Sequence, residues 1–258
     1  MIGAIFGDIV GSVYEFNNIK TKDFDLFGKR NFFTDDTVMT VAVADALMQC
    51  EGDVELFKQI LIKMMHAYGK KYPYAGYGGN FGRWLRFEGD KPYGSFGNGS
   101  AMRVSPVGWY ADSLEETIDF ACASAEVTHN HPEGIKGAIV TAGAIYLART
   151  GESMEQIKAF VSGYYDLNFT LDEIRPTYRF NETCQETVPQ AMQAFFESTS
   201  FEDTVRNAIS LGGDSDTLAA IAGSVAEAYY GMTEEEKNKA ISYLDDDLLR
   251  VVGNFEFR

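Results

Sequence analysis

Signals for helix N-termini recur along the whole chain. In each, a Ser or Thr precedes an acid or amide by three residues, so that both side chains can bind free N–H groups of a first helical turn. The clearest pairs are Ser113 with Glu116, Ser153 with Gln156, Ser200 with Asp203, and Thr233 with Glu236. Thr187, followed by Val188 and Pro189, is predicted to be a further cap with proline in the first turn. This repetition predicts a chain of many helices.

Signals for β-strands are poor by comparison. Only residues 166–180 alternate in a strand-like way, and Pro176 interrupts them. The longest weakly patterned stretch runs from Gly69 to Met102 and is rich in Gly and Tyr, and we expect it to be a long functional loop. We therefore predict an all-α fold, with residues 1–258 forming a single domain.

The bulk composition excludes several classes of protein. Hydrophobic residues make up 45% and charged residues 23% of the 258 residues, which is typical of an ordered globular chain. The formal net charge of −16 disfavours nucleic acid or an anionic membrane as a partner. Three scattered cysteines fit reduced thiols, and we recognise neither a signal peptide nor a membrane-spanning stretch. We expect a cytoplasmic protein that binds no membrane.

An acidic cluster, Thr34-Asp35-Asp36, directly precedes a helical run from Thr37 to Met48. Thr34 could cap that helix, with the aspartates in its first turn, where the helix dipole favours negative charge. An adjacent pair of aspartates, however, adds like-charge repulsion that a simple cap would avoid. The cluster is therefore either a helix cap or one half of a metal site.

A second acidic cluster lies near the other end of the chain. Leu211-Gly212-Gly213 allows a sharp turn and leads into Asp214-Ser215-Asp216-Thr217, before a helical run to Tyr230. Together the two clusters offer carboxylate and hydroxyl oxygens without His or Cys, which suits Mg²⁺ or Mn²⁺ and disfavours zinc. We predict that the clusters meet in the fold and bind divalent metal, with two unrelated helix caps as the alternative.

The N-terminal segment carries further acids and a stripe of small residues. Asp8 and Glu15 are seven residues apart and would share one face of a helix, about 10 Å along its axis. From spacing alone, a solvated pair of acids and a catalytic carboxylate explain them equally well. A glycine stripe in a helix is explained by close approach to another helix or by ordinary tight packing, and we favour the latter. The stripe consists of Gly3, Gly7 and Gly11, and Ala219 and Gly223 are similarly spaced.

The middle of the chain contains a glycine-rich segment and two histidines. Residues 94–100 read Gly-Ser-Phe-Gly-Asn-Gly-Ser; their N–H groups could bind a pyrophosphate, and Phe96 could stack on a base. On this segment alone a flexible connection is the better explanation, because it matches neither the Walker nor the dinucleotide-binding spacing. His129 and His131 are expected to cap a helix or bind substrate, and His66 to be structural.

Taken in order, these features resemble the ADP-ribosylglycohydrolase family. The paired acidic motifs near opposite ends of the chain are the specific part of the resemblance. It implies an all-α orthogonal bundle of many helices around a binuclear metal site that holds two divalent cations, Mg²⁺ or Mn²⁺. The matching segments are Gly3 to Phe16, Phe33-Thr-Asp-Asp-Thr37, Gly97-Asn-Gly-Ser-Ala-Met-Arg103, Thr128-His129 and Gly213-Asp-Ser-Asp-Thr217.

The resemblance also implies roles for individual residues. Glu15 and Asp36 match catalytic acids that orient or deprotonate the attacking water. The positions that match metal ligands are Thr34, Asp35, Asp36, Asp214, Asp216 and Thr217. The positions that match substrate contacts, around the adenosine and the diphosphate, are Gly94, Ser95, Phe96, Gly97, Asn98, Gly99, Ser100 and His129.

The implied activity is metal-dependent hydrolysis of the glycosidic bond at C1 of the distal ribose in ADP-ribose conjugates. The expected partner is an ADP-ribosylated protein or a small ADP-ribose conjugate, and nucleic acid is disfavoured. ADP-ribosyl-arginine on proteins is the first expectation, and ADP-ribosyl-serine or a small O-linked conjugate is the alternative. An inactive, crystallin-like relative is the alternative of another class, and the complete set of acids disfavours it. Residues 69–90 match no pattern that would identify the acceptor.

Overall fold

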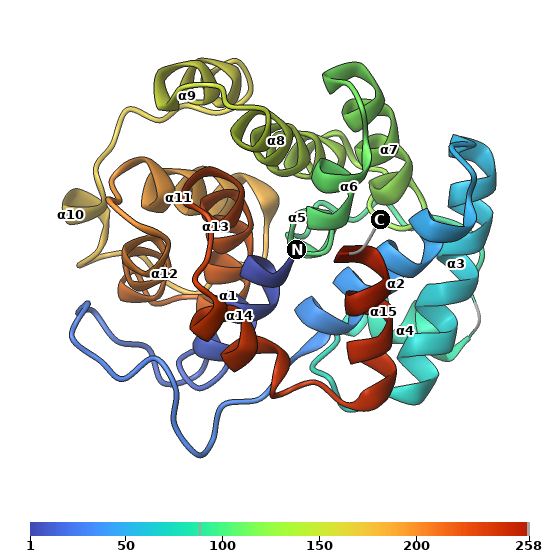
Figure 1. Cartoon of the computed structure of the whole chain (residues 1–258), viewed down its shortest axis with the longest axis horizontal. Coiled ribbons are helices and arrows are strands. Elements are labelled where there is room, and N and C mark those ends of the chain that lie inside the picture. Colours follow the sequence, from blue (N-terminus) through green and yellow to red (C-terminus); the bar gives the residue numbers. More distant parts are fainter. Residues whose placement is uncertain (88, 257–258) are drawn as a thin grey trace.

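The computed structural model describes residues 1–87 and 89–256, which form helices and loops without a strand (Figure 1). Over these residues the only extended pairing is an isolated bridge between Gly97 and Thr183, so the all-α prediction is confirmed. No helix of the described part is both long and apolar enough to cross a membrane. The helices are α1 (Ile2–Gly11), α2 (Asp35–Gln49), α3 (Val54–Lys71), α4 (Gly79–Arg86), α5 (Gly99–Met102), α6 (Ser105–Tyr110), α7 (Leu114–Glu126), α8 (Pro132–Arg149), α9 (Met154–Ser162), α10 (Leu171–Ile174), α11 (Cys184–Phe196), α12 (Phe201–Ser210), α13 (Ser215–Tyr230), α14 (Glu234–Ile241) and α15 (Asp246–Glu256).

Two antiparallel helices, α1 and α13, lie at the centre of the molecule (Figure 1). All of α1 is buried, and so is α13 from Ser215 to Glu227. A β-carbon on any stripe glycine of α1 would come closer than 3.0 Å to backbone atoms of α13, so the stripe serves direct backbone contact rather than ordinary side-chain packing. We call this contact the glycine seam, and its pairs are Gly3 with Gly223, Gly7 with Ala219, and Gly11 with Asp216.

The glycine seam ends on one side at a buried acid, Glu227 of α13. Its carboxylate accepts hydrogen bonds from the backbone N–H groups of Ile2 (3.2 Å) and Gly3 (2.8 Å) and lies 2.9 Å from the amino group of Met1. The first N–H groups of a helix have no partner within the helix and carry partial positive charge. The Glu227 carboxylate supplies both an acceptor for these N–H groups and a negative charge at the start of α1.

Three groups of helices cover this central pair (Figure 1). α8 packs on α13 and contacts α5, α6, α7 and α9; α2 packs on α1 and contacts α3 and α15; and α11 and α12, which contact each other, also pack on α13. Glycines also allow close approach on α8, where Gly137 faces Cys184 of α11 and Gly143 faces the ring of Phe160 of α9. The N-termini of α2 and α13 both reach the second half of α1, and the predicted acidic clusters lie there.

The predicted caps are confirmed at α7, α9, α12 and α14. In each, the cap hydroxyl accepts a hydrogen bond from the N–H group three residues later; the caps are Ser113, Ser153, Ser200 and Thr233. The cap expected at Thr187 is wrong, because α11 begins at Cys184 and Pro189 lies inside the helix. A long-range contact sets the start of this helix, since the Cys184 N–H group donates to the Phe96 carbonyl oxygen (2.9 Å).

Two stretches that were expected to lack helix contain helices. α3 continues through Gly69, and α4 and α5 follow before residue 103, so the prediction of one long loop is wrong in part. The missing side chain of Gly69 makes room for Leu85 of α4, whose methyl carbons would lie 2.8 Å from an added β-carbon. Residues 166–180, expected to be extended, include α10, which is held by a capping box of Thr170 and Glu173.

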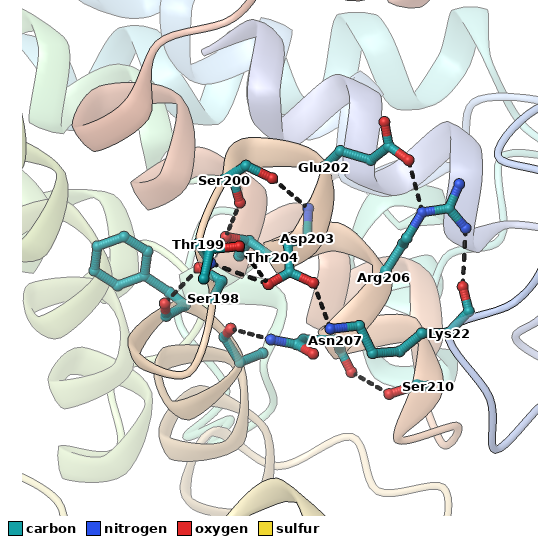
Figure 2. Close-up of polar contacts among 12 residues, drawn as sticks. Lys22, Ser198, Thr199, Ser200, Glu202, Asp203, Thr204, Arg206, Asn207 and Ser210 are labelled. Carbon is teal, nitrogen blue, oxygen red and sulfur yellow. Dashed lines mark hydrogen bonds and ion pairs between the residues drawn. The ribbon is translucent and has the colours of Figure 1, made fainter.

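The loop between α1 and α2 is fastened to α12 by charged side chains (Figure 2). Lys22 forms an ion pair with Asp203, and the Arg206 guanidinium donates to the carbonyl oxygens of Lys22 (2.9 Å) and Phe24 (2.7 Å). Arg206 also pairs with Glu202, one turn earlier on α12. These contacts anchor the middle of the loop, whose first residues border the site described below.

Candidate functional site

Asp8 of α1 organises the N-terminus of α2. Its carboxylate is fully buried and accepts four hydrogen bonds, from the N–H and hydroxyl groups of Thr34 and of Thr37. The Thr34 nitrogen and hydroxyl oxygen lie 2.9 and 2.7 Å from the carboxylate, and the Thr37 nitrogen lies 3.0 Å away. Because these donors belong to the first turn of α2, Asp8 also places negative charge at the favourable end of that helix dipole.

The first predicted acidic cluster lies at this helix start. Thr34 is the N-cap of α2, and its hydroxyl oxygen accepts a hydrogen bond from the N–H group of Asp36 (3.2 Å). Asp36 is buried, and its Oδ2 atom accepts a hydrogen bond from the hydroxyl group of Thr217 in the second cluster (3.2 Å). The cluster is therefore a helix cap and also a meeting point of the two motifs.

The turn before the second cluster depends on two glycines in the left-handed region. Gly212 (φ 66°) and Gly213 (φ 74°) carry the chain from α12 into α13. The Asn18 side chain donates to the Gly213 carbonyl oxygen (2.9 Å) and accepts from its N–H group (2.8 Å). The same amide donates to the Glu15 carbonyl oxygen (2.9 Å). Asn18 therefore ties the segment around Glu15 to the second acidic motif.

Acids from both motifs and from the N-terminal segment converge between α1, α2 and α13. Carboxylate oxygens of Asp8, Asp36 and Asp216 lie within 4.8 Å of one another. The same holds for Glu15, Asp214 and Asp216, so Asp216 belongs to both groups. Together with the neighbouring Asp35 they form what we call the acid cluster, which comprises Asp8, Glu15, Asp35, Asp36, Asp214 and Asp216.

The acid cluster brings carboxyl groups together without a basic partner among the described residues. Burial, followed by repulsion from neighbouring carboxylates, raises the pKa of Asp36 and of Asp216 well above the ordinary value. Burial raises the pKa of Asp214 to about 7 and that of Asp8 to about 6, although hydrogen bonds to both act in the opposite direction. The ion pairs between described residues include no member of the cluster.

The oxygens of the acid cluster suit a divalent cation. Asp36 Oδ1 is buried and has no hydrogen-bond partner among the described residues. Buried carboxylate oxygens normally have a donor, so this atom is left for a ligand from outside the chain. The other atoms available are carboxylate and hydroxyl oxygens, which are the donors that Mg²⁺ and Mn²⁺ prefer. A bound cation would also offset the repulsion between the acids.

Glu15 reaches the acid cluster from a loop and not from a helix. α1 ends at Gly11, so the prediction that Asp8 and Glu15 share one helix face is wrong. The Asn31 side chain donates to the carbonyl oxygens of Ile9 (2.8 Å) and Val10 (3.3 Å), which the next helical turn would otherwise use. A residue from the following loop therefore ends the helix.

Glu15 is the member of the acid cluster with the clearest path to solvent. Its side chain is half-buried, whereas Asp36 and Asp216 are buried. Burial, and then the charges of Asp216, Asp8 and Glu182, raise the pKa of Glu15 to about 8. A carboxyl group that titrates near neutral pH and reaches water is suited to proton transfer.

Residues 94–100 form a structured turn beside the acid cluster. Several of their N–H groups already bond within the chain, so fewer donors are free for a pyrophosphate than the sequence suggested. The bonded pairs are Gly94 with Asn130, Gly97 with Ser95, and Asn98 with Glu182. The buried Asn98 side chain donates to Asp214 Oδ2 (2.7 Å), and the buried Ser100 hydroxyl donates to the Gly134 carbonyl oxygen (2.7 Å). Phe96, in contrast, is 44% exposed; its ring lies 5.2 Å from that of His131, and its exposed part is available to a stacking partner.

His129 lies beneath this turn. It is buried, and its Nε2 atom faces Gly97 and Gly99, where a β-carbon on Gly99 would be 3.1 Å from that nitrogen. Burial, and then the nearby charge of Arg103, hold the pKa of His129 well below its ordinary value. His129 is therefore neutral at physiological pH.

The other two histidines have structural contacts. His131 is the N-cap of α8, and its Nδ1 atom accepts a hydrogen bond from the N–H group of Glu133 (3.1 Å). His66 of α3 stacks on Trp84 of α4 with the ring centroids 4.3 Å apart. Both agree with the expected capping and structural roles.

Two residues that build the site, Thr37 and Asn18, were not singled out from the sequence, and Asp8 was considered only beside Glu15, as a solvated acid or a catalytic carboxylate. Asp8 lies between Gly7 and Gly11 of the stripe, and this position next to a close helix contact could have indicated its burial. Thr37 follows Thr34 by three residues, so both hydroxyls lie on one face of the helix start. Nothing in the sequence indicates that Asn18 would bind a turn formed by residue 213.

The chain matches a known family over most of its length. The sequence profile described as ADP-ribosylglycohydrolase covers residues 1–238. A solved structure titled "ADP-ribosylglycohydrolase-related protein complex" superposes with a TM-score of 0.60 at 22% identity, covering 97% of this chain and 96% of that one. This likeness concerns the fold.

Characterised relatives are similar in sequence as well. The ADP-ribosylhydrolase ARH3 of Mus musculus is 28% identical, over 91% of this chain and 83% of that protein, and the Homo sapiens protein of the same name is 27% identical, over 96% and 90%. The ADP-ribosylarginine hydrolase Tri1 of Pseudomonas putida (strain GB-1) is 26% identical, over 90% and 70%. The chain belongs to the ADP-ribosylglycohydrolase family and is an enzyme of the ADP-ribosylhydrolase kind.

Proposed function

We propose that this ADP-ribosylhydrolase removes ADP-ribose from arginine side chains of proteins, by hydrolysis of the bond at C1 of the distal ribose, with two divalent cations in the acid cluster. One observation supports the reaction above all: within the part of the chain that the structure describes, buried carboxylates converge without a basic partner, and an oxygen of Asp36 has no hydrogen-bond partner. We infer Mg²⁺ or Mn²⁺, held by Thr34, Asp35, Asp36, Asp214, Asp216 and Thr217. Bound there, the cations would supply Lewis-acid activation of water and of the ribose hydroxyls.

Glu15 is the residue to which we assign proton transfer. The C1–N bond breaks with its electron pair moving to the guanidino nitrogen, and the oxygen of a water molecule bonds to C1. Glu15 takes a proton from that water and returns it to the departing nitrogen, so the carboxylate is regenerated. Its raised pKa and its access to solvent suit both halves of this transfer. Asp36, which is buried and points into the cluster, is assigned to the metal instead.

The turn of residues 94–100 is placed to bind the ADP portion. We assign stacking on the adenine to the exposed ring of Phe96 and a hydrogen bond to the diphosphate to His129, which lies beneath Gly97 and Gly99. Asn98 has a different task, since its side chain holds Asp214 of the acid cluster. The turn of residues 94–100 would therefore contact the nucleotide on one side and hold a proposed metal ligand, Asp214, on the other.

The surroundings of Glu15 favour a cationic, planar acceptor. Phe16 follows Glu15 directly and is 81% exposed, and its ring lies 6.3 Å from that of Phe180 at an interplanar angle of 22°. Glu182 is close enough to raise the pKa of Glu15. Guanidinium groups stack on aromatic faces and pair with carboxylates, whereas the ether oxygen of an O-linked serine carries neither a charge nor a proton to donate. The relative from Pseudomonas putida that is named an ADP-ribosylarginine hydrolase is consistent with this assignment.

Release of ADP-ribose from matched arginine-linked and serine-linked peptides, with Mg²⁺ and after chelation, tests the proposal. We expect release from the arginine-linked peptide only, and only with the metal. Glu182→Gln and Phe16→Ala are expected to raise KM for the arginine-linked peptide and to leave free ADP-ribose binding unchanged. Preference for the serine-linked peptide would refute the assignment to arginine and indicate an O-linked conjugate as the substrate. Release from neither peptide would refute the proposed function.

A further inference from the structure

Arg103, one residue after α5, is a buried cation without a carboxylate partner among the described residues. It is 1% exposed, and its NH2 group donates to the Ser124 carbonyl oxygen (2.7 Å) and to the Thr128 hydroxyl oxygen (2.9 Å). Its Nε atom is buried and has no partner in the described chain. Burying an unpaired charge is costly, so its presence in a strongly acidic protein calls for a reason.

The contact with Arg103 favours one direction for the hydrogen bond between Thr128 and His129. Guanidinium nitrogens only donate, so the Thr128 hydroxyl oxygen must be the acceptor in its contact with Arg103. Thr128 Oγ1 also lies 2.8 Å from His129 Nδ1, its only other partner among the described residues. A hydroxyl oxygen can accept two hydrogen bonds, but a protonated Nδ1 would leave the proton of this buried hydroxyl group without an acceptor, so donation from the hydroxyl group to Nδ1 is favoured. An Nδ1 atom that accepts a hydrogen bond carries no proton of its own.

The other ring nitrogen must then carry the proton of the neutral imidazole. Nε2 faces Gly97 and Gly99, and neither glycine has a side chain to fill the space in front of it. Nε2 has no hydrogen-bond partner among the described residues. Unlike Asp36 Oδ1, it is not completely buried, so a ligand can reach it. His129 thus presents a single N–H donor toward the turn of residues 94–100.

We propose that Arg103 and Thr128 are positioning residues, which hold His129 as the Nε2–H tautomer so that it donates to an anionic oxygen of the ligand bound at residues 94–100. The reverse tautomer would turn a lone pair toward that oxygen and repel it. The uncompensated charge of Arg103 favours an anion in the same place. The identity of the oxygen, a diphosphate oxygen of ADP-ribose, rests on the proposed function, whereas the tautomer does not.

The tautomer can be measured directly in the metal-free wild-type protein. The chain has three histidines, so an ¹⁵N-histidine spectrum at pH 7.5 is simple, and His66→Gln and His131→Gln variants assign it by subtraction. We expect the ring of residue 129 to show a protonated Nε2 and an unprotonated Nδ1. A protonated Nδ1, or a doubly protonated ring, in the wild-type protein would overturn the proposal, so this test needs no substitution of Arg103 or Thr128.

Two matched substitutions separate positioning from folding. Thr128→Val keeps the shape of the side chain and removes the hydroxyl group, and Thr128→Ser restores the hydroxyl group. In the Val variant we expect a mixture of tautomers and ADP-ribose binding weakened about tenfold by calorimetry, and in the Ser variant both values close to wild type. An unchanged ¹⁵N spectrum and an unchanged ADP-ribose affinity in Thr128→Val would overturn the proposed positioning role of Thr128.

The outcomes also separate this inference from the proposed function. A wild-type protein with the Nε2–H tautomer that binds ADP-ribose yet cleaves no conjugate supports the inference and refutes the function. A protein that cleaves the arginine-linked peptide but has His129 protonated on Nδ1 supports the function and refutes the inference.

Discussion

Both ends of the α1–α13 pair bury carboxylates, but the charge is balanced in different ways. At one end Glu227 receives two backbone N–H groups and lies 2.9 Å from the amino group of Met1. At the other end Asp36 and Asp216 lie among further carboxylates, and one oxygen of Asp36 has no partner among the described residues. The same two helices, joined by the glycine seam, carry both arrangements.

The difference separates a structural acid from a functional one. The Glu227 carboxylate has all its partners within the fold, so its interactions stabilise the position of α1. The acid cluster is incomplete without a ligand, and burial, followed by repulsion between neighbouring carboxylates, raises the pKa of Asp36 and of Asp216. Removing charge at the two ends should therefore have opposite effects on stability and on metal binding.

The largest effect is expected at the acid cluster. Asp36→Asn or Asp216→Asn should lower Mg²⁺ affinity and ADP-ribose release together, by at least about 100-fold, because each removes a charged ligand. Without metal, either variant should melt no lower than wild type, since repulsion within the cluster is reduced. Calorimetry and thermal melts measure both. Glu235→Gln, on the exposed face of α14, is the matched control, and unchanged Mg²⁺ binding in the Asp variants would mean that no metal is shared between the motifs.

The next largest effect tests the seam that joins the two ends. Gly7→Ala would place a methyl group against the backbone of Ala219, which cannot move without shifting α13. We expect a loss of about 3 kcal/mol or more in the free energy of unfolding in urea. Gly253→Ala in α15, where no atom lies within 4 Å of the added carbon, should instead stabilise by about 0.5–1 kcal/mol. Similar values for the two variants would show that the seam is not in contact.

Glu227→Gln probes the balanced end. It removes the charge that faces the amino group of Met1 and keeps an acceptor for the N–H groups of Ile2 and Gly3. A loss of about 2 kcal/mol in unfolding free energy is expected, with Mg²⁺ affinity unchanged. Glu256→Gln, whose carboxylate is 3.7 Å from the same amino group and more exposed, is the control with a smaller loss. A fall in Mg²⁺ affinity in Glu227→Gln would contradict the division between the two ends.

The last prediction concerns the dependence of stability on pH. In the folded, metal-free protein the pKa values of Asp8, Asp214 and Glu15 are raised to about 6, 7 and 8, so the folded state binds more protons than the unfolded state between about pH 4 and pH 8. Stability from these groups is greatest below pH 4 and is lost as the pH rises to 8. Melting temperatures in a chelator should fall over this range, and saturating Mg²⁺ should flatten the slope. A melting temperature that rises with pH in the chelator would contradict the raised pKa values.

Local signals in the sequence predicted much of the fold. Ser113 and Thr233 cap helices where expected, because an N-cap hydrogen bond needs only residues within one turn. The failures come from contacts between distant residues. Thr187 is no cap, because Cys184 binds Phe96 and starts its helix one turn earlier. No local rule contains that partner.

For the candidate site, the sequence indicated which oxygens belong together but not how they are held. Asp36 and Thr217 do come into contact, as the paired motifs suggested. The position of Glu15 was wrong, since the helix that should have carried it is ended by Asn31 from the following loop. The role of Asp8 was not predicted, because its four donors lie at the start of another helix and are brought to it only when α1 and α2 pack together.

The backbone contact at Gly11 has a consequence for ion selectivity. Because Gly11 has no β-carbon, α1 contacts the Asp216 backbone directly. No flexible side chain lies between α1, which carries Asp8, and α13, which carries Asp216. The distance between these two helix backbones is therefore set by peptide geometry, and it limits how far Asp216, a proposed metal ligand, can move away from α1. Magnesium binds oxygen at about 2.0–2.1 Å and calcium at about 2.3–2.6 Å, so a site whose backbones cannot move apart favours the smaller ion. Part of any selection by ionic radius would then lie in the contact between two helix backbones.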